Sequence, residues 1–157
     1  GKAHARAGVG VYWGKDDIRN VSREAHGHPA TNNVAELEAM EDALIGIRDT
    51  VPVSTPVTIV ADTLYGIRCV TEWYDGFVRR GWKTVGNKPV QNQALIERVR
   101  ALWIAMPHVM FYHVRGHVGI HGNEAADVLA TRAIAPPPEP KPEPRKPRVS
   151  RKRKVSC

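Results

Sequence analysis

VTIVAD, at residues 57–62, sets the class of fold and points to a site. Its first five residues are apolar or β-branched, which predicts a strand too apolar to face water on either side. The strand ends in a carboxylate, Asp62. In α/β sheets, ligands and chemistry collect beyond the carboxyl ends of such strands. We therefore expect Asp62 at the rim of a functional site.

Strands and helices alternate on both sides of this stretch. The clearest helix spans residues 31–49, where an apolar stripe recurs at steps of three and four residues: Val34, Leu37, Met40, Leu44 and Ile47. Similar patterns predict strands at 8–14, 21–26 and 109–114, and helices at 63–73, 92–105 and 123–134. This order predicts an α/β fold in which helices flank a mixed sheet.

Composition and charge divide the chain into two parts. The 157 residues, 42% of them hydrophobic, have room for one domain with a core, and no stretch reaches the roughly 20 apolar residues of a membrane helix. Residues 136–157 hold eight of the 23 Lys and Arg residues and two of the 16 acids, a net charge of +6 that leaves +1 on the remainder. We expect a globular domain at 1–135 and a disordered, Pro-rich basic tail at 136–157.

Three acids lie on segments that can meet beyond one edge of the sheet. Asp62 ends the apolar strand, Glu36 adjoins the apolar stripe of the first helix, and Asp127 lies on the last helix. Converging carboxylates are typical ligands of a divalent cation, and oxygen-only ligands suit Mg²⁺ or Mn²⁺ better than zinc. The pattern predicts a carboxylate metal site.

Each acid also has a simpler interpretation. Glu36 follows Asn33 by three residues, which fits a helix-capping pair. Asp62 can cap the helix that follows it, and Asp127 is an ordinary acid of an amphipathic helix when taken alone. Glu38, on the same helix as Glu36, is predicted to face solvent.

Histidines give a second signal. His113, His117 and His121 are spaced by four residues, which on a helix would suggest zinc, but the glycines between them argue against a helix, so we reject a zinc site. His117, in a glycine-rich loop before Asp127, either carries protons and helps to release product or is a solvated loop residue.

Aromatic and basic residues alternate between the second and third predicted helices. Trp73, Phe77 and Trp82 lie among Arg and Lys residues at 79–88. The rings are either core residues under a solvated loop or stacking surfaces beside phosphate-neutralising charge. Together with a carboxylate metal site, the composition favours a nucleic-acid phosphodiester as substrate.

Six segments in this order resemble the type 1 ribonucleases H, which cut the RNA of RNA–DNA hybrids. They are AGVGVYWG (7–14), TNNVAELEAM (31–40), VADTLYGI (60–67), EWYDGFVRRGWKT (72–84), KPVQN (88–92) and HVRGHVGIHGNEAADVLA (113–130). The resemblance implies a five-stranded mixed sheet, in the family's order 3-2-1-4-5, with helices on both faces. In the family the first strand precedes the segment that corresponds to AGVGVYWG, so we expect a truncated chain that lacks this strand and the first catalytic aspartate.

The resemblance also implies roles for individual residues. It places Glu36, Asp62 and Asp127 on metal-binding carboxylates and His117 on the histidine of a mobile loop. The implied substrate contacts comprise a DNA-phosphate pocket, residues that read the RNA minor groove and an aromatic channel for the DNA strand: Thr31 and Asn92, Asn32 and Asn33, and Trp73 and Phe77, respectively.

The activity implied by the resemblance is endonucleolytic hydrolysis of the RNA strand by two metal ions, Mg²⁺ or Mn²⁺, which leaves 5′-phosphate and 3′-hydroxyl ends. The alternative is an inactive module that binds hybrids or RNA. We expect an intracellular monomer with no membrane partner. The basic segment at 145–157 is similar to nuclear-import or nucleic-acid-binding clusters, which favours the nucleus over the cytoplasm, although it also fits a solvated terminus.

Overall fold

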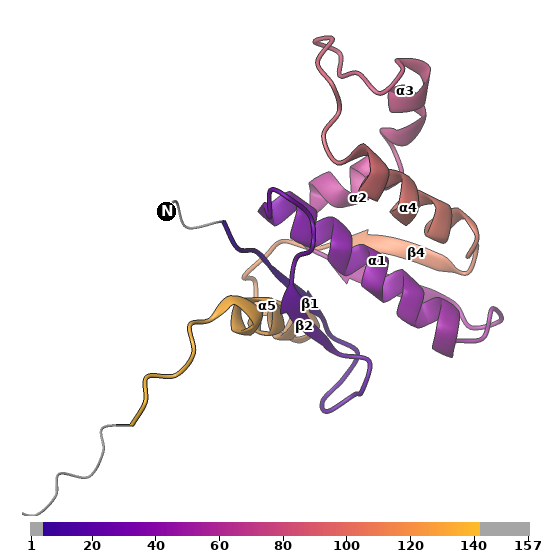
Figure 1. The fold of residues 1–157 in the computed structure, drawn as a ribbon. Coiled ribbons are helices and arrows are strands. Elements are labelled where there is room, and N and C mark those ends of the chain that lie inside the picture. The colour runs from indigo at the N-terminus through magenta and orange to yellow at the C-terminus, as the bar shows by residue number, and fades with distance from the viewer. Residues whose placement is uncertain (1–4, 142–157) are drawn as a thin grey trace, which may run out of the picture.

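The computed structural model describes residues 5–141, which form four strands and five helices (Figure 1). Their order and bounds are β1 (Gly8–Val11), β2 (Val21–Glu24), α1 (Asn32–Thr50), β3 (Val57–Ala61), α2 (Leu64–Val70), α3 (Tyr74–Arg79), α4 (Gln93–Ile104), β4 (Val109–His113) and α5 (His121–Ile134). The predicted α/β class is confirmed. No helix of the described residues is long and apolar enough to cross a membrane.

The strands form two separate pairs. β1 and β2 are antiparallel, with Gly8 opposite Glu24 and Val11 opposite Val21. β3 and β4 are parallel and in register over their full length. Within residues 5–141 no ladder of hydrogen bonds joins the two pairs. The predicted order has these two pairs on either side of a middle strand, and the five-stranded sheet stays a prediction.

Helix α1 divides the interior into two clusters. Its predicted apolar stripe is buried as expected and contacts residues of α2 and α4 in the main cluster, which includes Leu44, Val70 and Ile96. The second cluster is smaller and consists of Ala7, Val9 and Ala35. Helix α1 therefore contributes residues to both clusters, and its small residue Ala35 faces β1.

The helix begins with a different cap from the predicted one. The hydroxyl of Thr31 accepts a hydrogen bond from the backbone N–H of Val34 at 3.2 Å, so Thr31 and not Asn33 caps α1. Glu36 lies further into the helix, and its carboxylate is thus free for another role.

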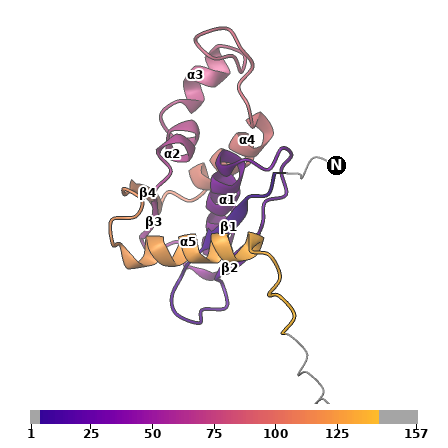
Figure 2. The same ribbon diagram turned by 90° about the vertical axis from the view of Figure 1, so that its left-hand side faces the viewer.

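The expectation that β3 is covered on both faces is wrong for the described residues. Val60 is 45% exposed, and on β4 Met110 and Tyr112 are 61% and 62% exposed. The other faces of these strands pack on the main cluster through Ile59 and Phe111. The last helix, α5, packs across β1 and β2 instead (Figure 2), which leaves one face of β3 and β4 open.

The approach of α5 to β1 depends on two glycines. A methyl group at Gly8 would overlap the carbonyl oxygen of Ala130, and one at Gly10 would overlap the carbonyl oxygen of Ala126 and lie 2.7 Å from the backbone nitrogen of Ala130. Because these neighbours are backbone atoms, they cannot rotate aside. The glycines allow α5 to lie directly on the strand.

The helix predicted at 63–73 is interrupted. α2 ends at Val70, and α3 begins at Tyr74. The hydroxyl of Thr71 donates a hydrogen bond to the carbonyl oxygen of Ile67 at 2.7 Å, and the backbone of Thr71 leaves the helical region. Such side-chain bonds to the preceding turn compete with helix continuation.

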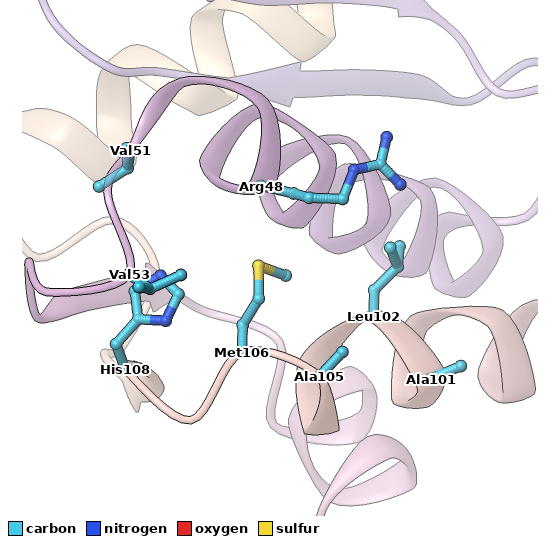
Figure 3. Close-up of a pocket in the computed structure, with 8 residues that line it drawn as sticks. All are labelled: Arg48, Val51, Val53, Ala101, Leu102, Ala105, Met106 and His108. Atoms are coloured by element: carbon cyan, nitrogen blue, oxygen red, sulfur yellow. The ribbon is translucent and has the colours of Figure 1, made fainter.

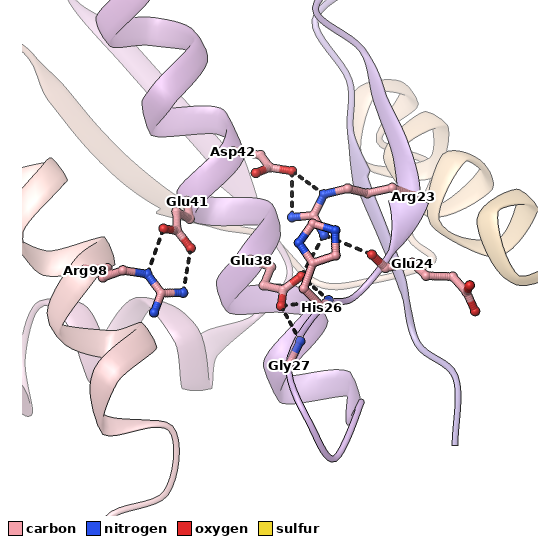
Figure 4. A network of polar contacts seen from close by, with 8 residues as sticks. All are labelled: Arg23, Glu24, His26, Gly27, Glu38, Glu41, Asp42 and Arg98. Atoms are coloured by element: carbon pink, nitrogen blue, oxygen red, sulfur yellow. Dashed lines mark hydrogen bonds and ion pairs between the residues drawn. The ribbon is translucent and has the colours of Figure 1, made fainter. Parts of the chain in front are cut away.

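A buried carboxylate ties β2 and the following loop to α1 (Figure 4). Glu38 is only 4% exposed, which corrects the prediction of a solvent-facing residue. Its oxygens accept hydrogen bonds from the backbone N–H groups of His26 and Gly27 at 2.8–3.0 Å and from Arg23 at 2.7 Å. Arg23 also contacts Asp42. Burial alone opposes the charged carboxylate, but Arg23 and the N–H donors outweigh it and lower the pKa of Glu38.

Glu38→Gln is expected to lower the free energy of unfolding by about 2–3 kcal/mol at pH 7, because the charge-assisted hydrogen bonds of a buried carboxylate are lost.

This effect depends on pH. The pKa of Glu38 is lower in the folded chain than in the unfolded chain, where it is about 4.3. The stabilisation by the Glu38 charge is therefore present above that pH and disappears as the pH falls through the folded value. Urea unfolding at pH 7 and at pH 3 measures both effects. Glu41→Gln, which removes the charge beside the exposed Arg98, is the control. A difference from wild type that does not change with pH would contradict this account.

The proposed domain boundary falls at the end of α5. Residues 136–141 form neither helix nor strand, and the remainder of the predicted disordered tail, 142–157, lies outside the described residues.

Candidate active site

A groove of about 830 Å³ lies between β1 and β3. Helices α1 and α5 supply its other walls, mainly through small and apolar residues such as Ala39, Ala43 and Ala130. The lining also includes Glu36, Asp62, Asp127 and His117. The edges of β1 and β3 that face this groove have no strand partner among the described residues.

Glu36 projects from α1 and is half-buried. Burial raises the pKa of its carboxyl above the usual range, and the nearby charge of Asp62 raises it further, whereas a hydrogen bond from the hydroxyl of Thr63 lowers it. The charge of Asp62, which follows β3, is thus felt by Glu36 on α1, in the groove that both residues line.

Asp62 follows β3 and is exposed. Its Oδ2 accepts a hydrogen bond from Nδ2 of Asn123 at 3.2 Å. The loop after β4 also comes close, because a methyl group at Gly116 would lie 3.1 Å from the same oxygen. Asp62 therefore lies where the end of β3, this loop and the start of α5 meet, in agreement with its predicted place at the rim.

Asp127 and His117 line the same groove and are exposed. Asp127 lies on α5, and His117 lies in the preceding loop with a φ of 57°, which is an uncommon backbone conformation for a side-chain-bearing residue. In residues 5–141, no three His, Cys, Asp or Glu side chains are close enough to hold a metal ion. The three predicted acids thus line one groove, but within the described residues they do not form a ligand set.

The charge of the groove fits a divalent cation. Among the described residues, three that line it are acids and none is Lys or Arg. Carboxylate oxygens are the ligands that Mg²⁺ and Mn²⁺ prefer, and a bound cation would offset both the burial and the charge of Asp62 that raise the pKa of Glu36.

The residues predicted to hold a DNA phosphate, Thr31 and Asn92, start two helices. Thr31 caps α1, and Asn92 precedes α4 with a φ of 62°. The amide of Asn92 contacts the hydroxyl of Tyr65 at 3.5 Å. Of the predicted minor-groove residues, Asn32 lines the groove and Asn33 is exposed.

The two rings predicted to contact a DNA strand differ in exposure. Trp73 is 37% exposed, whereas Phe77 is buried in the main cluster. Their centres are 6.5 Å apart in an edge-to-face arrangement. Trp73 is therefore accessible to a ligand, and Phe77 supports it from below.

Sequence reasoning missed three residues of the site: Asn123, Thr63 and Tyr65. Thr63 accepts a hydrogen bond from the N–H of Gly66 as the cap of α2, and a threonine before a helical pattern is a signal for that role. Asn123 and Tyr65 contact residues far along the chain, so no local pattern identifies these contacts.

A second cavity, of about 410 Å³, lies beside the C-terminal ends of α1 and α4 (Figure 3). Its lining is mostly apolar and consists of Arg48, Val51, Val53, Ala101, Leu102, Ala105, Met106 and His108. It contains no acid and none of the predicted site residues, so the larger groove is the better candidate for chemistry.

Comparison with known sequences gives consistent matches. The sequence model of the family described as RNase H matches residues 1–135. Ribonuclease H of Schizosaccharomyces pombe is 38% identical over 135 residues, which cover 86% of this chain and 48% of that protein. Ribonuclease H of Thermosynechococcus vestitus is 40% identical over 126 residues, which cover 80% of this chain and 76% of that protein. The chain thus spans about half the length of the first relative.

Solved structures share the fold. The ribonuclease H domain of prototype foamy virus aligns with a TM-score of 0.58 at 23% identity and covers 74% of this chain and 71% of that domain. The foamy viral protease-reverse transcriptase in complex with an RNA/DNA hybrid aligns with a TM-score of 0.60 at 24% identity, over 73% of this chain and 15% of that protein.

Proposed function

This chain belongs to the ribonuclease H family, and from that premise we propose that it cleaves the RNA strand of RNA–DNA hybrids endonucleolytically. The observation that carries the proposal is that Glu36, Asp62 and Asp127 all line one groove, which among residues 5–141 has no Lys or Arg in its lining. Many hydrolases that act on phosphodiesters use such a cation site, and the exposed indole of Trp73 and the basic residues that follow it suit a nucleic-acid strand.

Divalent-metal dependence is general in the family, and we propose Mg²⁺, with Mn²⁺ as a substitute. Glu36, Asp62 and Asp127 would hold the metal. Divalent ions bound in such a site supply an activated water and stabilise the leaving oxygen, and the products carry 5′-phosphate and 3′-hydroxyl ends.

The other residues of the groove orient these groups. Asn123 fixes one oxygen of Asp62, which keeps the other available. The hydroxyl of Thr63 holds Glu36, and its own position is fixed by the N–H of Gly66. His117, exposed on its loop, is placed to carry a proton or to help the product leave.

Substrate selection follows from two sets of contacts. Asn32 and Asn33 would read 2′-hydroxyl groups of the RNA strand. On the other strand, Thr31 and Asn92 would hold a DNA phosphate, and Trp73 with Phe77 beneath it would contact deoxyribose. We propose that a monomer makes all of these contacts.

We further propose that the active enzyme has a five-stranded sheet whose middle strand occupies the groove. The facing edges of β1 and β3 leave backbone N–H and C=O groups without ladder partners in the described residues, and buried groups of this kind require hydrogen bonds. This strand would bring the fourth carboxylate. The alternative function is a module that binds hybrids without cutting them, and the open ligand set among residues 5–141 is the observation that would favour it.

A labelled RNA–DNA hybrid tests the proposal, with residues 1–157 and with the longest polypeptide that the same reading frame encodes. We expect both to bind the hybrid, and only the form that supplies the middle strand to cut the RNA, in a reaction that requires Mg²⁺. Binding without cleavage by either form would establish the binding module. Failure of both forms to bind would overturn the proposed function.

A further inference from the structure

Residues 73–91, here called the arm, project beyond α2 and α4 (Figures 1 and 2). The arm contains α3 and a loop and carries four basic side chains and one acid. Its accessible indole, Trp73, is the group proposed above to contact the DNA strand. Whatever orients the start of the arm therefore determines where this indole lies.

Aromatic contacts give the arm its shape. The ring centres of Tyr74 and Trp82 are 5.5 Å apart, and those of Phe77 and Trp82 are 5.7 Å apart. Phe77 also packs in the main cluster and attaches the middle of the arm to the body. At the start of the arm, Tyr74 packs against the same cluster, and the backbone N–H of Trp73 donates a hydrogen bond to the carbonyl oxygen of Arg68 at 2.7 Å.

Arg100 of α4 adds a further attachment at the start of the arm. Its Nη1 donates a hydrogen bond to the carbonyl oxygen of Val70 at 2.9 Å. Its guanidinium carbon lies 4.8 Å from the ring centre of Tyr74 and 5.4 Å from that of Trp103. Its Nη2 lies 3.7 Å from Oδ1 of Asp75. One side chain thus contacts the end of α2 and the beginning of α3.

The carbonyl and ring contacts carry this attachment. Val70 is the last residue of α2, where carbonyl groups lack partners within the helix and basic side chains are favoured. Asp75 is 74% exposed, so its ion pair contributes little, whereas the side chain of Arg100 is only 20% exposed. A lysine would keep the charge but could not hold the carbonyl and stack on a ring with one planar group.

We propose that Arg100 is a positioning residue that spans the bend between α2 and α3 and so orients Trp73 toward the DNA strand of a hybrid. The proposal rests on the function proposed above. It requires that loss of the guanidinium lowers the affinity for the hybrid and increases the mobility of the arm, while the protein remains folded.

Arg100→Lys tests the proposal, with Arg98→Lys as the matched control. Arg98 lies on the same helix, is 57% exposed and pairs only with Glu41 among the described residues. Affinity for a fluorescent hybrid, measured in EDTA so that no cleavage occurs, is expected to fall about five- to tenfold for Arg100→Lys and less than twofold for the control. Amide hydrogen exchange of the arm is expected to accelerate only in Arg100→Lys. Asp75→Asn, which removes the exposed ion pair alone, is expected to behave as the control.

The outcomes separate this proposal from the proposed function. Equal hybrid affinity of Arg100→Lys and Arg98→Lys would overturn the positioning role, even if exchange of the arm accelerates. Unchanged exchange would overturn the attachment itself. If the unmodified protein does not bind the hybrid, the proposed function fails and the positioning role fails with it. If Arg100→Lys lowers both Tm and hybrid affinity, and a stabilising osmolyte restores both, the residue has only a structural role and the positioning proposal is overturned.

Discussion

Asp62→Asn is expected to slow hybrid cleavage on the order of a thousandfold while the fold survives. Asparagine has nearly the same shape, and its carbonyl oxygen can still accept the hydrogen bond from Asn123. What disappears is one negative charge of the proposed cation site. Since Asp62 is exposed, its replacement removes no buried contact, and stability should change by less than about 0.5 kcal/mol.

Single-turnover cleavage of a labelled hybrid in Mg²⁺ measures this effect, with the form of the protein that cuts. Burial chiefly raises the pKa of Glu36, and the charge of Asp62 adds to it, so the substitution should move that pKa only part of the way toward its usual range, which carboxyl NMR can follow. Asp75→Asn, an exposed acid on the arm, is the control and should cut at the wild-type rate. A wild-type rate for Asp62→Asn would remove Asp62 from the proposed catalytic residues.

Gly10→Ala is expected to destabilise the protein by about 3 kcal/mol, which for a chain of this length lowers Tm by roughly 10 °C. The added methyl meets the backbone of Ala126 and Ala130, so α5 must move away from β1. Because α5 carries Asn123 and Asp127, we expect cleavage to be impaired even below the new Tm.

Gly14→Ala is the matched control, since a methyl group at Gly14 has no heavy atom within 4 Å. Thermal unfolding followed by circular dichroism should place it within about 2 °C of wild type. If Gly10→Ala unfolds at the wild-type temperature, the contact of α5 with β1 is looser than described.

Elements with strong local patterns were predictable from the sequence. The apolar stripe of α1 and the apolar run of β3 specify a helix and a strand because period and composition act over neighbouring residues. The break at Thr71 was not predicted, because it depends on a side-chain bond to Ile67 that competes with the helix. The burial of Glu38 was also missed, because its partners, Arg23 and the loop at 26–27, come from another element.

The candidate site was predictable in part. Glu36, Asp62 and Asp127 line one groove, as expected for acids near one edge of the sheet, and the family resemblance is confirmed. Their role in binding a metal stays a prediction. The contact of Asn123 with Asp62 could not be anticipated, since the two residues are 61 positions apart.

The division of the interior into two clusters has a consequence for cooperativity. Asp62 follows a strand of the main cluster, Asp127 lies on the helix that covers β1 and β2, and Glu36 lies on the shared helix. The smaller cluster, of Ala and Val side chains, buries less apolar area, so its half of the molecule is the first to open by subglobal fluctuation. We expect such an opening to move Asp127 away from Glu36 and Asp62, so the time that the three acids spend in one groove would depend on the stability of the smaller cluster and not on the global free energy of unfolding.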